Sequence, residues 1–173
     1  MSVRKSIAIV GATENIGEEI TMRFMKSNYS LLLISNNKDK LDYLAKKVAE
    51  KKPKAEINFM ECVKDGCWEA DIIILAVPAL EEEEVAKLMK EVATQKIVVD
   101  VSNEENACGE LQKILPYSKV VRVSGDFYSK ELIIKGDSET VNEPAWAAAR
   151  EISEIFIQAG YRVSIATNSP VNK

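Results

Sequence analysis

The segment near the amino terminus that combines glycines with a β-branched run has the residue types needed to bind a phosphate group. Residues 7–17 read IAIVGATENIG. Gly11 and Gly17 occupy the first and third positions of a G-x-x-G-x-x-G fingerprint, where the first permits a tight turn and the third lets a helix pack closely on the strand. The amino terminus of that helix would offer free N–H groups to a pyrophosphate. We assign this cofactor-binding turn to Gly11, Ala12, Thr13, Glu14, Asn15, Ile16 and Gly17.

Glu14 stands where the fingerprint expects its middle glycine. That glycine normally lets the backbone approach the pyrophosphate. A carboxylate about 5 Å from one phosphate charge would repel it by ~3 kcal/mol at an effective dielectric constant of ~20. Such a repulsion would lower the affinity by about two orders of magnitude. If the side chain extends into water instead, only the restriction on the backbone remains, and the sequence leaves both outcomes open.

A polar segment follows the second hydrophobic run and consists of Ser35, Asn36, Asn37 and Lys38. An NAD site usually has an acid at this point, which accepts hydrogen bonds from the ribose hydroxyls. No acid occurs here, and we expect Asp39 to fall inside the next helix. Hydroxyl, amide and ammonium donors suit a 2′-phosphate, so the segment favours NADP over NAD. The alternative is a polar turn that only caps the second helix.

The chain contains no histidine and therefore lacks the commonest general base and metal ligand. Its cysteines, Cys62, Cys67 and Cys108, form neither a CxxC pair nor an evident disulfide set, and we expect small buried or idle thiols. The sequence predicts no metal site and names no catalytic residue. Any chemistry must use carboxylates, lysines or thiols, or depend on a cofactor.

Composition limits the class of protein. The chain has 173 residues, of which 46% are hydrophobic and 29% charged, and we expect one globular domain over residues 1–173. The net charge of −4 argues against a nucleic-acid or membrane-surface partner. The longest apolar run, Ile72–Leu80, is too short to span a bilayer, and Glu14 follows Ile7–Ala12 before any cleavage signal. We predict a cytoplasmic protein whose partner is a small-molecule dinucleotide.

Short β-branched runs alternate with amphipathic stretches, a pattern typical of a mostly parallel sheet with helices on both faces. The run Ile72–Val77 is apolar throughout, as burial on both faces requires. We therefore predict a doubly wound, Rossmann-type α/β fold. The predicted strands are 6–10, 31–35, 57–60, 72–77, 97–101, 120–123, 132–135 and 161–166, and the predicted helices are 16–24, 41–48, 81–93 and 143–159.

Several segments together resemble one family of reductases. GATENIG, ISNNKDKL, DIIILAVP, KIVVDVSN, ELQKILPYSKVVRV and GYRVSIATNSP occur in the order seen in the NADP:coenzyme factor 420 (deazaflavin) oxidoreductases. The chain is also similar to the cytosolic oxidoreductase domain of the six-transmembrane ferric reductases, which have a DVSN-type strand end. The resemblance spans nearly the whole chain and depends on order and spacing. GATxxIG alone also resembles atypical short-chain dehydrogenase/reductase relatives.

The resemblance implies hydride transfer between NADPH and a flavin or deazaflavin co-substrate. Carried over by position, Ala76, Val77 and Pro78 would line the nicotinamide-ribose side, and Ser102 and Asn103 would lie where the ring sits. Hydride transfer needs alignment more than a proton shuttle, which suits a chain without histidine. The simpler alternatives are a strand that ends at a helix start and a helix N-cap.

The chain departs from the family pattern at two places. The segment Val123–Tyr128 is short where these enzymes have a longer loop that contributes to the substrate pocket. The chain ends at Lys173, where the deazaflavin enzymes continue into helices that help form the substrate site and the dimer. We therefore interpret the resemblance as truncated, and a homodimer is left open.

The sequence leaves alternative classes of function beside the leading hypothesis of an NADPH-binding oxidoreductase. One is a non-catalytic dinucleotide-binding or interaction protein on the same scaffold. Another is an atypical short-chain reductase, which would need a Tyr-x-x-x-Lys pair. Tyr43 and Lys47 have that spacing, but we expect both on the second helix, away from the crevice.

Overall fold

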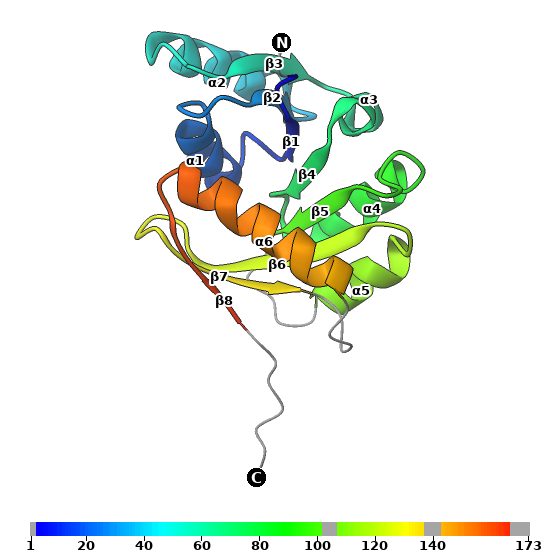
Figure 1. Cartoon of the computed structure of the whole chain (residues 1–173). Coiled ribbons are helices and arrows are strands. Elements are labelled where there is room, and N and C mark those ends of the chain that lie inside the picture. Colours follow the sequence, from blue (N-terminus) through cyan, green and yellow to red (C-terminus); the bar gives the residue numbers. More distant parts are fainter. Residues whose placement is uncertain (1–2, 102–106, 137–142, 167–173) are drawn as a thin grey trace.

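The computed structural model describes residues 3–101, 107–136 and 143–166. These residues form an eight-stranded sheet with the order β3-β2-β1-β4-β5-β6-β7-β8 (Figure 1). Strands β1 to β6 are mutually parallel, β7 is antiparallel to β6, and β8 is parallel to β7. The order of the first six strands is that of the doubly wound dinucleotide-binding fold, so the predicted Rossmann-type class is confirmed.

The strands are β1 (Ser6–Val10), β2 (Ser30–Ile34), β3 (Glu56–Met60), β4 (Ile72–Leu75), β5 (Ile97–Asp100), β6 (Lys119–Asp126), β7 (Glu131–Gly136) and β8 (Arg162–Ile165). The helices are α1 (Asn15–Phe24), α2 (Lys38–Glu50), α3 (Val63–Glu69), α4 (Ala79–Met89), α5 (Ala107–Ile114) and α6 (Glu143–Gln158). None of the helices in the described part of the chain is long and apolar enough to cross a membrane.

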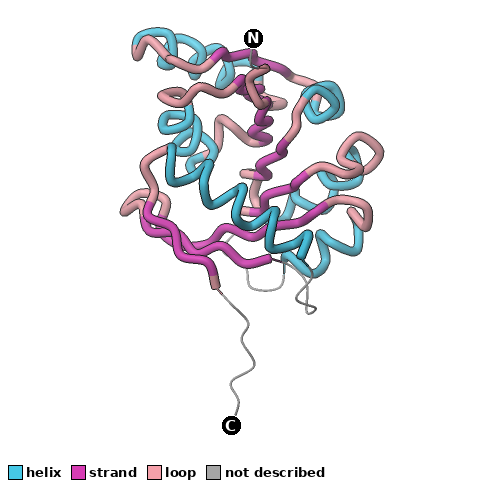
Figure 2. The backbone as a smooth tube through the Cα atoms, viewed as in Figure 1, coloured by secondary structure: helices cyan, strands magenta, loops and turns pink. Residues whose placement is uncertain are grey.

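Separate hydrophobic cores lie on the two faces of the sheet. Alternate residues of each strand point to opposite faces, so Ile9 belongs to one core and Val10 to the other. The first core packs against α1, α2 and α6, where Phe24 and Phe156 meet edge to face. The second core packs against α3, α4 and α5. Helices therefore cover both faces, as Figure 2 shows.

Two helices were not predicted, α3 and α5. Each has at most eight residues, so neither repeats an apolar spacing often enough to give a clear helical pattern. Helix α3 also contains Gly66, a residue type with low helix propensity. A Cβ at Gly66 would lie 2.3 Å from Ile34 Cδ1, which indicates that close packing on β2 favours glycine there.

The short segment Val123–Tyr128 lies mostly in a strand and not in a loop. Strand β6 runs to Asp126 and then turns directly into the antiparallel strand β7. The Asp126 carboxylate accepts hydrogen bonds from the N–H groups of Tyr128 and Ser129, at 2.9 and 3.1 Å. These bonds hold the pKa of Asp126 below its usual value. An Asp side chain that accepts from backbone two and three residues later stabilises a tight turn, so this segment is a hairpin.

Candidate functional site

The carboxyl edge of the sheet has a topological switch point between β1 and β4, because the next strands in the chain extend in opposite directions from there. Ligands of doubly wound sheets bind in the crevice at this point. A pocket of about 550 Å³ opens there, and we call it the carboxyl-edge pocket. It is lined by Val10, Gly11, Glu14, Ile34, Ser35, Asn36, Glu61, Cys62, Val63, Lys64, Val77, Glu81, Glu84, Val85 and Leu88.

The predicted phosphate turn forms one wall of the carboxyl-edge pocket. Gly11 has a φ of +82°, a conformation that favours glycine. A Cβ at Gly11 would lie 2.6 Å from the carbonyl oxygen of Ala76, and one at Gly17 would lie 2.0 Å from the carbonyl oxygen of Gly11. The N–H groups of Gly11 and Ala12 donate to the carbonyl oxygen of Ile34, which fixes the turn against β2. Both glycines therefore have the steric roles that the fingerprint predicts.

Glu14 does not restrict the backbone in the way that the sequence suggested. Its φ and ψ are −82° and 162°, an extended conformation that any residue adopts, so the turn needs no glycine at this position. The carboxylate of Glu14 lies 3.6 Å from the ammonium of Lys40, and both side chains are about half exposed. Glu14 is thus partly neutralised by Lys40, a residue of α2 that the sequence analysis missed. The sequence signal for this contact was the position of Lys40 in the first turn of α2, two residues after Lys38.

The polar segment after β2 has a structural role in two of its four residues. The hydroxyl of Ser35 is buried, lies 2.8 Å from the hydroxyl of Thr13 and accepts the N–H of Asn37. The Asn37 side chain caps α2 by accepting the N–H of Lys40 at 3.0 Å. Asn36 is exposed and lines the pocket, while Lys38 is exposed at the start of α2. The capping alternative therefore describes Ser35 and Asn37, whereas Asn36 lines the carboxyl-edge pocket.

The residues predicted to surround the nicotinamide lie at the end of β4. The N–H of Ala76 donates to the carbonyl oxygen of Val10 at 2.8 Å, Val77 lines the pocket, and Pro78 is the N-cap of α4. A strand does end at a helix start here, and Val77 also faces the carboxyl-edge pocket. Ser102 and Asn103 lie outside the described residues.

The pocket also contains residues that no motif indicated. Glu61, Cys62, Val63 and Lys64 follow β3, and they reach the pocket because parallel strands all end at the same edge of the sheet. Glu81 and Glu84, predicted only as a solvated helix start, come from α4. With Glu14 and Glu61 these residues give the pocket an acidic rim. An anionic ligand would have to overcome this charge.

The two described cysteines differ in environment. Cys62 is exposed and lines the pocket, whereas Cys67 is a fully buried residue of α3 itself. Burial raises the pKa of the Cys67 thiol from 9.0 to about 12, so the thiol stays protonated at neutral pH. Within the described ranges, no three cysteines or carboxylates are grouped so that they could hold a metal ion.

The family to which the chain belongs is shown by a match that includes the residues of the carboxyl-edge pocket. A family model described as NADP oxidoreductase coenzyme F420-dependent matches residues 6–104, more than half of the chain. The chain belongs to this family. Members of the coenzyme F420-dependent NADP oxidoreductase family are oxidoreductases, and the expected resemblance is confirmed. No curated protein matches the chain.

Solved structures support the same fold. A putative F420-dependent NADP-reductase from Arthrobacter sp. FB24 has a TM-score of 0.72 at 12% identity, over 94% of this chain and 84% of that one. A pyrroline-5-carboxylate reductase from Coxiella burnetii has a TM-score of 0.72 at 17% identity, over 97% and 60%. A diketoreductase has a TM-score of 0.79 at 16% identity, over 98% and 66%. The chain thus spans about 60 to 66% of the two latter enzymes.

Proposed function

We propose that the chain binds NADP(H) in the carboxyl-edge pocket and transfers hydride between this dinucleotide and a flavin or deazaflavin type of acceptor. The proposal rests on membership of the coenzyme F420-dependent NADP oxidoreductase family together with the phosphate turn. The observation that carries it is Gly11, because its positive φ and its close approach to the backbone of Ala76 allow the tight turn from β1 toward α1 that borders the carboxyl-edge pocket. The nicotinamide supplies the hydride, and the chain supplies binding and alignment.

The proposed contacts follow the pocket from the phosphate turn outward. The first-turn N–H groups of α1 lack acceptors within the helix, and they would hold the pyrophosphate. Asn36 would donate to the ribose phosphate, and the ammonium of Lys40 would reach the same group from α2. Val77 would contact the ribose on the nicotinamide side. These residues fit the cofactor, although the acidic rim opposes it.

The preference for NADP over NAD depends on charge at the end of β2. Residues 35–38 offer an exposed amide at Asn36 and an ammonium group at Lys38 but no carboxylate for a ribose hydroxyl, and Lys40 adds a second ammonium group from α2. Replacing Asn36 by Asp should narrow or reverse the ratio of the two affinities, because an acid accepts from ribose hydroxyls and repels a 2′-phosphate. Equal affinities in the parent protein, unchanged by Asn36→Asp, would remove the basis for the preference.

Turnover tests the proposed reaction directly. NADPH oxidation should be followed at the nicotinamide absorbance band with free flavin or deazaflavin as acceptor and without added metal. We expect turnover in the parent protein and in Gly160→Ala, and none in Gly11→Ala, whose added methyl group would block the turn.

The second candidate is a dinucleotide-binding protein without catalysis. The tight hairpin between β6 and β7 favours it, because the resemblance predicts a longer loop for an acceptor pocket at this place. NADPH that binds saturably yet reduces no acceptor of the flavin type would support this candidate and contradict the oxidoreductase proposal.

A further inference from the structure

A single row of register partners crosses the sheet at its carboxyl edge. From β3 to β7 its members are Met60, Ile34, Val10, Leu75, Asp100, Arg122 and Lys135. Register partners share a face of the sheet, and the row points to the face covered by α3, α4 and α5. Its apolar end forms part of the carboxyl-edge pocket through Ile34 and Val10. The other end carries charge.

Arg122 is a member of this row that has a buried donor without a hydrogen-bond partner. It is only 8% exposed, and its Nε is buried without a hydrogen-bond partner. Among the described residues its guanidinium makes neither a hydrogen bond nor an ion pair within 4.0 Å. A buried cation without a partner is destabilising, because it loses water and gains nothing in return.

The neighbours of Arg122 do not use its donors. Lys135 stands directly opposite on β7, and like charges at opposed positions of an antiparallel pair repel each other. Asp100 stands beside Arg122 on β5 and is fully buried, but it has interactions of its own, as does the buried Glu82 of α4. Arg122 and Lys135 therefore stand opposite each other at this end of the row, and we call them the cationic pair.

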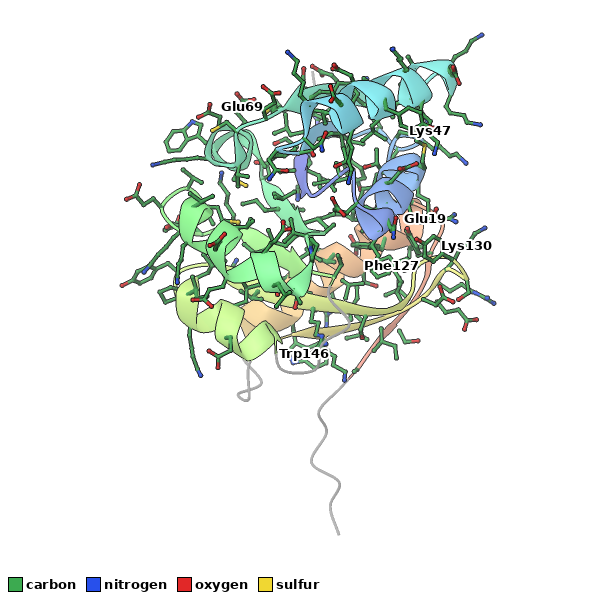
Figure 3. The ribbon with its side chains drawn as sticks, turned by 180° about the vertical axis from the view of Figure 1, so that it is seen from behind. Glu19, Lys47, Glu69, Phe127, Lys130 and Trp146 are labelled. Atoms are coloured by element: carbon green, nitrogen blue, oxygen red, sulfur yellow. The ribbon has the colours of Figure 1, made fainter. Side chains whose placement is uncertain are left out.

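The cationic pair meets solvent at its Lys135 end, on β7. Lys135 is exposed, and so is the adjacent Ile133 on the same face, at 44%. Seen from behind, α4 and α5 cover one part of this face, and the hairpin turn that bears Lys130 lies at the end of β7 away from Lys135 (Figure 3). Neighbouring strands are ~4.8 Å apart, so Arg122 lies about 14 Å along the row from Val10.

We propose that Arg122 and Lys135 form a subsite for a carboxylate or phosphate group of a small molecule that enters the crevice beyond the dinucleotide. A guanidinium with free N–H donors binds such groups through charge-assisted hydrogen bonds. The identity of this molecule as the hydride acceptor rests on the proposed function, whereas the anion subsite itself does not.

Anion binding to the protein without dinucleotide tests the subsite. Inorganic phosphate and succinate should be titrated separately, because the two distinguish a phosphate from a carboxylate site. At least one of them should raise the Tm of the parent protein, and equally that of Lys26→Gln, which changes an exposed lysine with no part in the row. Arg122→Met should lower the affinity for at least one of these anions by about tenfold or more. Without anion, its Tm should not fall, since the variant removes a buried charge that has no partner among the described residues.

Amide resonances separate this subsite from the phosphate turn and do not require that Arg122→Met folds. In the parent protein, one of the two anions should shift the resonances of Arg122, Val123 and Lys135, and Lys135→Gln should weaken that response several-fold. Shifts confined to Gly11, Ala12 and neighbouring residues would overturn the proposal, as would an equal anion response in Arg122→Met or none in the parent protein. If NADPH fails to bind while the response at Arg122 persists, the proposed function fails and the subsite stands.

Discussion

Gly11 combines two properties that a residue with a side chain could not provide at its position. Its φ is positive, and the space that a Cβ would occupy is taken by the backbone of Ala76. Gly160 offers a matched comparison, because its φ is +95° and nothing lies within 4 Å of its added Cβ. The two glycines thus share the conformational requirement and differ in the steric one.

Gly160→Ala should lower the free energy of unfolding by about 1 kcal/mol, the usual cost of placing alanine at positive φ. Gly11→Ala should cost about 2–4 kcal/mol, because the new methyl group must also displace the backbone at the end of β4. Urea denaturation of both variants measures the difference. Equal losses would show that the turn tolerates a Cβ and that the close approach is not a constraint.

The charges of Glu14 and Lys40 should have opposite effects on the affinity for the dinucleotide. Glu14→Gln should tighten NADPH binding by removing repulsion, with the larger gain at low salt. Lys40→Gln alone removes the cation beside the Glu14 carboxylate. It should therefore weaken the binding of both NADPH and NADH. If Lys40 contacts the 2′-phosphate, adding Lys40→Gln to Glu14→Gln should lower the affinity for NADPH by about tenfold and leave the affinity for NADH unchanged. Lys46→Gln, an exposed change on the same helix, serves as the control.

Helix α3 is held at its carboxyl end by a single lysine. The ammonium of Lys96 donates to the carbonyl oxygens of Cys67 and Trp68, at 2.6 and 2.7 Å. A cation at this end also complements the helix dipole, and partial burial lowers the pKa of Lys96. Because α3 and the residues before it line the carboxyl-edge pocket, this contact positions part of the site.

Lys96→Met should lower the free energy of unfolding by about 1–2 kcal/mol, since charge-assisted hydrogen bonds are lost at a helix end. Hydrogen exchange should accelerate most in α3, whereas the exposed change Lys90→Met should leave it unaltered. Unchanged exchange in α3 after Lys96→Met would mean that the packing of Cys67 alone holds the helix.

The long periodic elements could be predicted from sequence because burial imposes a repeating pattern on them. The β1 strand and the apolar faces of α1 and α6 follow this pattern, and their predicted ranges agree closely with the structure. Helices α3 and α5 are too short to show it. The hairpin at Asp126 was missed because a side chain that bonds its own turn leaves no hydrophobic signal.

The candidate site was predictable where a motif fixes the backbone, as at Gly11 and Gly17. It was not predictable where residues meet only after folding. Lys40 approaches Glu14 from α2, and Lys64 reaches the pocket because β3 ends at the same edge as β1. No spacing within the chain encodes such contacts, since they depend on the strand order.

At the scale of the whole molecule, buried acids of high pKa make the fold sensitive to alkali. Burial raises the pKa of the Cys67 thiol to about 12 and raises that of the Tyr161 hydroxyl as well. Above pH 9 the unfolded chain ionises Cys67 while the folded chain does not. Stability should therefore be full below pH 9 and fall at higher pH, by about 1 kcal/mol per pH unit from this group.

Urea denaturation between pH 7 and 11 measures this dependence. Cys67→Ala should flatten the decline above pH 9 and lower stability at pH 7 through the lost packing. The matched change Cys62→Ala, at an exposed cysteine, should alter neither. A decline as steep in Cys67→Ala as in the parent protein would assign the alkaline sensitivity to other groups.

The central claim is that the carboxyl-edge pocket of this family member binds NADP(H). Calorimetric titration of the parent protein with NADPH and with NADH tests it most directly, because it requires neither an acceptor nor turnover. The account predicts saturable binding of one dinucleotide per chain, with NADPH bound more tightly than NADH. A lack of saturation by either dinucleotide at millimolar concentration would contradict it.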